Sequence, residues 1–172
     1  SNVTPISQML AEQKIRHRIC SPSSLAMAVS KIKGLTDIEA NTVWKKLITL
    51  CYDLNINAYG SWPKAIYAAS TFGVLGGLEA HADLESAEKC LELGQPVVCS
   101  IDYAKGKLRG APLASTKGHL VTLIGIEDEQ ILVMDPAAPE KSSIARDYDR
   151  KEFEDAWLRN RGAGYYFCVT SE

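Results

Sequence analysis

Three residues of types that support nucleophilic catalysis occur along the chain in the order Cys20, His119 and Asp135. A thiol attacks only as its thiolate, and it needs a base within hydrogen-bond reach and a third group that orients the base. Cysteine, histidine and aspartate can supply these three functions. The sequence therefore predicts a catalytic triad, on the condition that the fold brings the three side chains together.

Cys20 differs in its surroundings from the other four cysteines of the chain. Ser21, Pro22 and a dense apolar run follow it, and Gly34 ends the run, which predicts a helix that starts at about Cys20. The free N–H groups and the dipole of a helix N-terminus favour a thiolate. The other cysteines lie in apolar stretches, where we expect them to be buried as small hydrophobic residues: Cys51, Cys90, Cys99 and Cys168.

His119 opens an expected strand over 119–126, and Asp135 closes its expected hairpin partner over 131–135. A hairpin brings these two ends to the same edge of a sheet, but the register decides whether the side chains share a face. A three-residue loop over 127–129 places both side chains on one face. A four-residue loop places them on opposite faces unless a bulge intervenes. The triad therefore requires an odd loop or a bulge in this hairpin.

The spacing of hydrophobic residues changes along the chain from the period of a helix to the period of a strand. The first half is expected to be helical, at about 20–33, 36–50, 62–72 and 84–93. The second half predicts strands over 96–101, 119–126, 131–135 and 164–169, a polar loop over 102–117 and one helix near 150–159. Helices followed by antiparallel strands form an α+β arrangement. No linker or internal repeat divides it, so we expect one domain over residues 3–170.

Composition excludes several classes of protein. The 172 residues include 46% hydrophobic and 23% charged residues, which is typical of a globular domain. The net charge of -2 argues against a nucleic-acid partner. One basic cluster is expected to be a solvated face: Lys14, Arg16, His17 and Arg18. No cysteine or histidine spacing is typical of a zinc site.

The sequence contains no membrane segment and no visible signal peptide, because no apolar run approaches the roughly 20 residues that span a bilayer. It begins with Ser1 and Asn2 and no Met. We therefore expect these two residues to be a tag remnant and the chain to be part of a longer protein. Removal of a signal peptide or of a preceding domain would leave the cellular compartment undetermined, with export as one alternative.

Five segments carry a resemblance to one family: Thr4–Gln8, Arg18–Met27, Gly94–Val98, Gly118–Val121 and Val133–Pro136. They resemble stand-alone relatives of the bacterial bacteriocin-processing (double-glycine leader) cysteine peptidases, the C39-like peptidases of the papain-like clan. The resemblance spans about residues 3–169. It implies a papain-like fold, in which a central helix of the N-terminal helical half carries Cys20 and the C-terminal half forms an antiparallel sheet.

The resemblance also implies roles, with Cys20 as the nucleophile, His119 as its base and Asp135 as the group that orients His119. A glutamine before the cysteine would help the Cys20 N–H form an oxyanion hole. Gln8 matches the family's Pro-x-x-Gln position, whereas Gln13 lies nearer to the spacing of papain-like enzymes in general. We favour Gln8, because the segment after it can loop out. No metal or organic cofactor is implied.

Ser21 departs from the family pattern, which often has glycine directly after the cysteine. A side chain there crowds the cleft or alters specificity, but it removes no catalytic group. Trp62 and the polar loop over 102–117 are candidates for the lining of a substrate cleft, although core packing is the favoured expectation for Trp62.

The leading hypothesis is a cysteine peptidase, a thiol hydrolase that cleaves a peptide or amide bond through an acyl-enzyme. Its expected partner is a peptide or an amide-containing substrate. Two alternatives stay open. One is a catalytically silent papain-like module that binds peptides, and the other is an acyltransferase that uses the same triad with an acceptor other than water.

Overall fold

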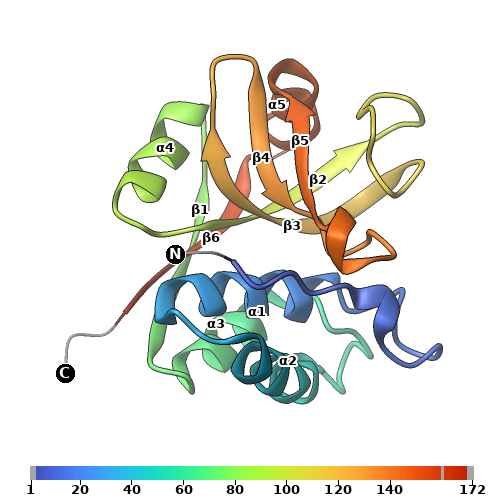
Figure 1. The fold of residues 1–172 in the computed structure, drawn as a ribbon, viewed down its shortest axis with the longest axis vertical. Helices are drawn as coiled ribbons and strands as arrows, with labels where there is room; N and C mark the ends of the chain where they lie inside the picture. Colours follow the sequence, from blue (N-terminus) through green and yellow to red (C-terminus); the bar gives the residue numbers. More distant parts are fainter. Residues whose placement is uncertain (1–2, 160, 170–172) are drawn as a thin grey trace.

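The computed structural model describes residues 3–159 and 161–169 and shows two layers (Figure 1). One layer holds the helices α1 (Cys20–Lys33), α2 (Asp37–Cys51) and α3 (Trp62–Ser70), preceded by a short 3-10 turn, η1 (Gln8–Leu10). The other layer is an antiparallel sheet. The helices α4 (Leu84–Glu92) and α5 (Arg150–Trp157) cover the face of this sheet that is turned away from α1.

The sheet has six strands in the order β1-β6-β2-β3-β4-β5, and every neighbouring pair is antiparallel. Their bounds are β1 Val74–Ala80, β2 Val97–Tyr103, β3 Thr116–Ile126, β4 Gln130–Met134, β5 Ala145–Asp149 and β6 Ala163–Val169. A second 3-10 turn, η2 (Lys141–Ser143), lies between β4 and β5. The expected α+β arrangement is confirmed.

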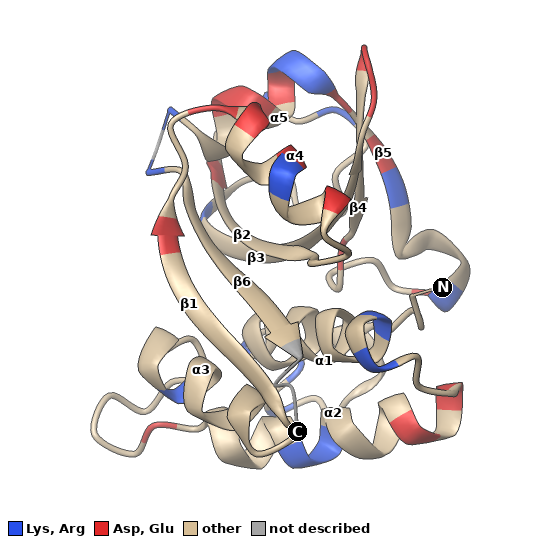
Figure 2. Ribbon diagram, turned by 90° about the vertical axis from the view of Figure 1, so that its left-hand side faces the viewer, with Lys and Arg blue, Asp and Glu red and all other residues tan. Residues whose placement is uncertain are grey.

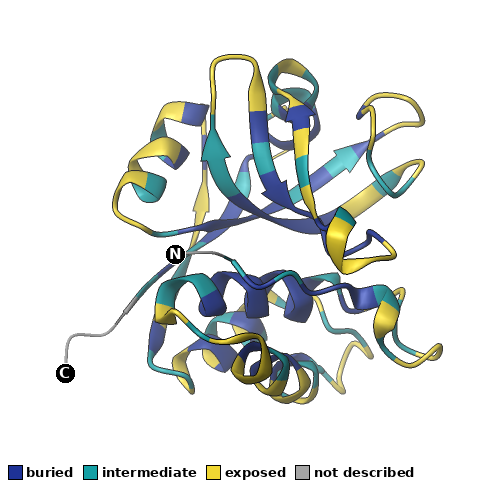
Figure 3. Ribbon diagram, in the orientation of Figure 1, coloured by how far each residue is buried: buried dark blue, intermediate teal, exposed yellow. Residues whose placement is uncertain are grey.

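The central helix α1 is buried between the sheet and α2 (Figure 3). Every residue from Ser21 to Ser30 is buried, so this helix has no solvated face over most of its length. Gly34 ends it in the left-handed conformation, with φ 62°, as its sequence predicts. Figure 2 shows that the lysines of α1 lie at its C-terminal end. The N-terminal end, where Cys20 lies, carries no charged residue of the helix itself.

Two strands were not expected, and the prediction of a wholly helical first half is wrong at β1. Gly76 and Gly77 weaken the strand pattern there, but they pair with the aromatic strand β6. A Cβ on Gly76 would lie 2.6 Å from the Phe167 ring, and one on Gly77 would lie 2.5 Å from the Tyr166 hydroxyl oxygen. These glycines therefore make room for aromatic rings. The other missed strand, β5, is a polar edge strand with charged residues, a composition that resembles a loop.

The lead-in before α1 is more ordered than the extended segment that the sequence predicts. Ser7 caps η1 by accepting a hydrogen bond from the Met9 N–H. The Ser7 hydroxyl also donates to the Ala138 carbonyl over 2.5 Å, and the Gln8 N–H donates to the Pro136 carbonyl over 2.9 Å. These contacts attach the lead-in to the loop that follows β4.

No helix in the described part of the chain is long and apolar enough to cross a membrane. Among the described residues, no group of three or more histidine, cysteine, aspartate or glutamate side chains is placed to hold a metal ion. The expected tag remnant, Ser1 and Asn2, lies outside the described residues.

Candidate active site

Cys20 is the first residue of α1, as predicted. The residue is only partly buried as a whole, but its thiol lies in a buried environment, where it forms a hydrogen bond with His119. Burial alone raises the pKa of the thiol. The hydrogen bond and charge of His119, together with the backbone groups of Leu120 and Ser21, outweigh that effect and hold the pKa below its ordinary value of 9.0.

Two hydrogen bonds one turn after Cys20 set the position of α1 against β3. The Ser24 hydroxyl donates to the Leu120 carbonyl, and the Thr122 hydroxyl donates to the Ser24 carbonyl, each over 2.8 Å. All three residues are buried. Because His119 directly precedes Leu120, these bonds hold the N-terminal turn of α1 beside the strand segment that carries His119. A small polar residue within an apolar helix is the sequence signal that could have indicated this link.

The β3–β4 hairpin contains a bulge, one of the two features that the sequence required to bring His119 and Asp135 to the same face. Ile126 pairs with Ile131, so four residues, 127–130, lie between the last paired residues. This register alone would put the His119 and Asp135 side chains on opposite faces. A bulge at Ile124 shifts the register, and Leu123 then pairs with Val133. Continued by two residues, this register sets Val121 opposite Asp135. His119 and Asp135 therefore share a face.

His119 and Asp135 form a short, buried hydrogen bond, in which His119 Nε2 lies 2.7 Å from Asp135 Oδ1. Because Nε2 is occupied, Nδ1 is the ring nitrogen left to meet Cys20. Burial alone lowers the pKa of His119. The charge of Asp135 and its hydrogen bond, and then those of Cys20, outweigh burial and raise the pKa of His119 to about 10.

Asp135 is fully buried but accepts hydrogen bonds on both oxygens. The Ala137 N–H donates to Oδ1 over 3.0 Å, and the Tyr148 hydroxyl donates to Oδ2 over 2.7 Å. Burial alone raises the pKa of this carboxyl. The charge and hydrogen bond of His119, followed by the bonds from Tyr148 and Ala137, hold the pKa below its ordinary value of 3.8.

These pKa directions describe one charge state of the site. They favour the thiolate of Cys20, the imidazolium of His119 and the carboxylate of Asp135. A thiolate paired with an imidazolium is a nucleophile with a proton donor already beside it. The arrangement can therefore attack an electrophilic carbon and then protonate a leaving group.

The two candidate glutamines differ in their surroundings. Gln8 is buried, whereas Gln13 is exposed. The Gln8 side chain donates one amide N–H from Nε2 to the Arg16 carbonyl over 2.7 Å. Its second amide N–H is not used by that bond, and its Oε1 is buried with no hydrogen-bond partner. The packing of Gln8 against the lead-in and the loop after Asp135 favours it over Gln13.

Ser21 is 1% exposed, and its hydroxyl oxygen is buried without a hydrogen-bond partner. A buried hydroxyl that lacks a partner is costly in free energy. The side chain therefore lies packed beside the nucleophile and does not project from the surface. The Ser21 hydroxyl therefore makes no hydrogen bond to Cys20, His119 or Asp135.

Several other expectations need correction. Trp62 is 51% exposed, so the prediction that it packs in the core is wrong. Cys51 and Cys99 are fully buried as predicted, but Cys90 and Cys168 are partly exposed. In the basic cluster, Arg18 does more than face solvent, because its guanidinium donates to the Asn57 carbonyl over 2.6 Å.

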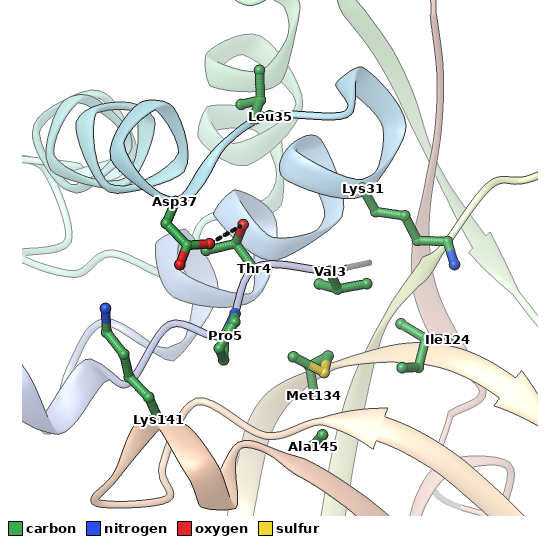
Figure 4. A pocket seen from close by; sticks show the side chains of 10 residues that line it. All are labelled: Val3, Thr4, Pro5, Lys31, Leu35, Asp37, Ile124, Met134, Lys141 and Ala145. Atoms are coloured by element: carbon green, nitrogen blue, oxygen red, sulfur yellow. Dashed lines mark hydrogen bonds between the residues drawn. The ribbon is translucent and has the colours of Figure 1, made fainter. Parts of the chain in front are cut away.

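A groove of about 540 Å³ lies elsewhere, beside the C-terminal part of α1 (Figure 4). Lys31 and Leu35 line it from the helical layer, and Ile124 and Met134 line it from the sheet. Neither Cys20 nor His119 borders this groove, so it is not the space in front of the nucleophile.

A helical layer whose central helix begins with a cysteine, set against an antiparallel sheet that presents histidine, defines a papain-like fold. The model of the Peptidase_C39 like family matches residues 1–165. The chain belongs to this family, as its motifs indicated. A comparison with curated proteins finds no match.

Solved structures of similar fold agree with this assignment. A protein of Bacillus anthracis described as a C39-like peptidase has a TM-score of 0.65 at 18% identity, covering 98% of this chain and 96% of that chain. A double-glycine motif protease from an AMS/PCAT transporter, solved with its leader peptide, has a TM-score of 0.63 at 17% identity, covering 98% and 93%. The peptidase domain of Streptococcus ComA, a bifunctional ABC transporter, has a TM-score of 0.60 at 15% identity, covering 98% and 100%. At these identities the likeness shows the fold.

Proposed function

We propose that this protein is a cysteine peptidase, a thiol hydrolase of peptide or amide bonds, with Cys20, His119 and Asp135 as its triad. One observation carries the proposal. The Cys20 thiol, whose pKa is lowered, is hydrogen-bonded to the buried imidazole of His119, and that imidazole lies 2.7 Å from a buried carboxylate. The three groups supply the nucleophile, the acid–base and the orienting charge that thiol catalysis needs.

The reaction follows from these positions. The Cys20 thiolate attacks the carbonyl carbon, and the Cys20 N–H and the free amide N–H of Gln8 stabilise the oxyanion. The His119 imidazolium gives its proton to the leaving nitrogen, the C–N bond breaks, and a thioester to Cys20 remains. Neutral His119 then takes a proton from water, which attacks the thioester. The carboxylic acid product leaves, and the thiolate–imidazolium pair is restored.

The substrate we propose is a peptide or an amide-containing molecule. A relative with the same fold is described in complex with a leader peptide, which supports a peptide as the class of substrate. Association with a larger protein is likewise proposed from the relatives, since one of them is a domain of a transporter.

The first test is competitive alkylation with iodoacetamide at pH 6, with each cysteine quantified by mass spectrometry. Cys90 and Cys168 are partly exposed and serve as internal controls, and burial followed by the charge of Glu79 raises the pKa of Cys90. A thiol of ordinary pKa is less than about 1% ionised at this pH. We expect Cys20 to react at least tenfold faster than either control, and Cys20→Ala to lose this fast phase. Equal rates at the three thiols, unchanged by His119→Ala, would contradict the proposal.

The second test separates hydrolysis from the two alternatives. The wild-type protein and Cys20→Ala are incubated with a diverse peptide mixture, and new termini are identified by mass spectrometry. Cys20-dependent cleavage supports the peptidase. Products joined to an added primary amine, without hydrolysis, would indicate acyl transfer. Fast alkylation of Cys20 with no turnover of any peptide would favour a silent binding module.

A further inference from the structure

Tyr148, a residue that the sequence did not single out, contacts the acidic member of the triad. Its hydroxyl donates a hydrogen bond of 2.7 Å to Asp135 Oδ2, while His119 and the Ala137 N–H occupy Oδ1. We propose that Tyr148 is a positioning residue of this site, which keeps Asp135 ionised and aimed at His119. This inference rests on the proposed triad.

The buried carboxylate needs this donor. Asp135 has no exposed surface, and an ionised carboxylate taken out of water requires hydrogen bonds to replace its hydration. A hydrogen bond to a charged group contributes more than one between neutral groups. Without Tyr148, Oδ2 has no other recorded donor among the described residues. The carboxyl would then hold its proton to a higher pH.

Tyr148 stays a donor across the working pH range. Burial, followed by the charge of Asp135 and the hydrogen bond to it, raises the pKa of the Tyr148 phenol far above its ordinary value. The hydroxyl therefore keeps its proton wherever the triad is charged. A group that never ionises can orient a carboxylate without competing for its protons.

The ring of Tyr148 is itself held in place. On β5, Tyr148 pairs with Ile131 of β4, which puts it on the sheet face that also carries Asp135. The ring stacks on Phe153 of α5, with centroids 6.3 Å apart and planes 12° from parallel. Tyr148 is 1% exposed. A chain of contacts thus runs from Phe153 through Tyr148 and Asp135 to His119.

A purely structural role would be a competing explanation, because any buried tyrosine can support packing. Tyr103 offers a matched control. It is also a buried residue of the sheet, but its hydroxyl donates to the Leu113 carbonyl over 3.0 Å and not to the carboxylate. Removal of the Tyr148 hydroxyl costs one buried hydrogen bond, and removal of the Tyr103 hydroxyl costs one partly buried hydrogen bond. Only removal of the Tyr148 hydroxyl should change the ionisation of the triad.

The test is the pH dependence of Cys20 alkylation by iodoacetamide from pH 3 to pH 9, in wild type, Tyr148→Phe and Tyr103→Phe. In Tyr148→Phe the pKa of Asp135 rises, so on acidification the carboxylate that orients the imidazolium against Cys20 is lost earlier, and the thiolate takes up its proton at a higher pH. We expect the acid limb to move up by about one pH unit, which is about tenfold in rate on that limb. Tyr103→Phe should keep the wild-type limb. An unmoved limb in Tyr148→Phe, or equal movement in both variants, would overturn the inference.

A second measurement separates loss of the bond to the carboxylate from a general structural effect of Tyr148→Phe. In the Asp135→Asn background, Tyr148→Phe should move the acid limb no further, because no carboxylate is left to hold. A further shift there would also overturn the inference. Slow, unselective alkylation of Cys20 in the wild type would instead refute the proposed function. Failure of the triad and failure of the Tyr148 role therefore give different results.

Discussion

Replacement of Asp135 by asparagine removes one negative charge from the site and keeps its shape. Asparagine has nearly the same volume, and its Oδ1 can still accept the hydrogen bond from His119 Nε2. The substitution therefore tests charge more than orientation. Asp135→Ala removes both and serves as the comparison.

The expected loss of the thiolate–imidazolium pair can be derived from the pKa of His119. The rise of its pKa from 6.5 to about 10 corresponds to a net preference for the imidazolium on the order of 5 kcal/mol. Burial opposes that rise, and Asp135 contributes more to it than Cys20 does. Loss of the charge should therefore remove on the order of half of this preference or more. That loss corresponds to about a hundredfold in the population of the thiolate–imidazolium pair.

The assay is the rate of Cys20 alkylation from pH 4 to pH 10. Wild type should show a broad plateau, since the pKa of Cys20 is lowered and that of His119 is raised. In Asp135→Asn the thiolate should form only near the ordinary thiol pKa. We expect about a hundredfold slower alkylation at pH 6 and a difference of only a few-fold at pH 9.

The same pKa directions set the sign of the effect on folding. The raised pKa of His119 contributes stability that is complete below about pH 6.5 and is lost as the pH rises through about 10. The lowered pKa of Asp135 contributes stability above about pH 3.8 that is lost on further acidification. Asp135→Asn should therefore lower the free energy of unfolding most between about pH 3.8 and pH 6.5, where both contributions are complete. If Asp135→Asn alkylates within threefold of wild type at pH 6 while Asp135→Ala is inactive, orientation matters and the charge argument is wrong.

Two further predictions concern the oxyanion hole and the backbone. Gln8→Ala should lower kcat by about ten- to a thousandfold with little change in KM on a peptide found by the mixture assay, because the lost donor acts on the oxyanion. Gln13→Ala should leave both constants unchanged, and a larger effect at Gln13 would reverse the choice between the two. Gly162→Ala should lower the free energy of unfolding by at least about 2 kcal/mol in urea titrations, because φ is +60° and the new Cβ would clash with the His81 carbonyl oxygen. Gly34→Ala has φ +62° but open space around the Cβ and should cost only about 1 kcal/mol; equal losses would show that the clash relaxes.

Local signals allowed part of the site to be predicted. A helix that begins at Cys20 follows from Pro22 in its first turn, and its end follows from Gly34. The expected capping by serine is wrong, because Ile19 is the N-cap and no side chain caps the helix. The strand that carries His119 follows from its apolar run. These features depend on neighbours within one turn or one strand, which is the range over which sequence patterns act.

Two strands escaped prediction because their partners lie far away in sequence. The glycines of β1 discourage a strand until the aromatic rings of β6 lie against them. The polar residues of β5 resemble a loop until β4 pairs with them. Because β5 was not foreseen, Tyr148 could not be connected with Asp135.

The sequence by itself determined the three chemical groups, their order and the helix that begins at Cys20. Only the tertiary structure decided how they meet. The bulge at Ile124 puts His119 and Asp135 on one face, and whether it forms depends on how the strands pair and pack. The burial of Gln8 depends on the loop after Asp135, and the bond from Tyr148 depends on the pairing of β5 with β4. Contacts between segments distant in the sequence leave no local pattern, so only the folded chain defines them.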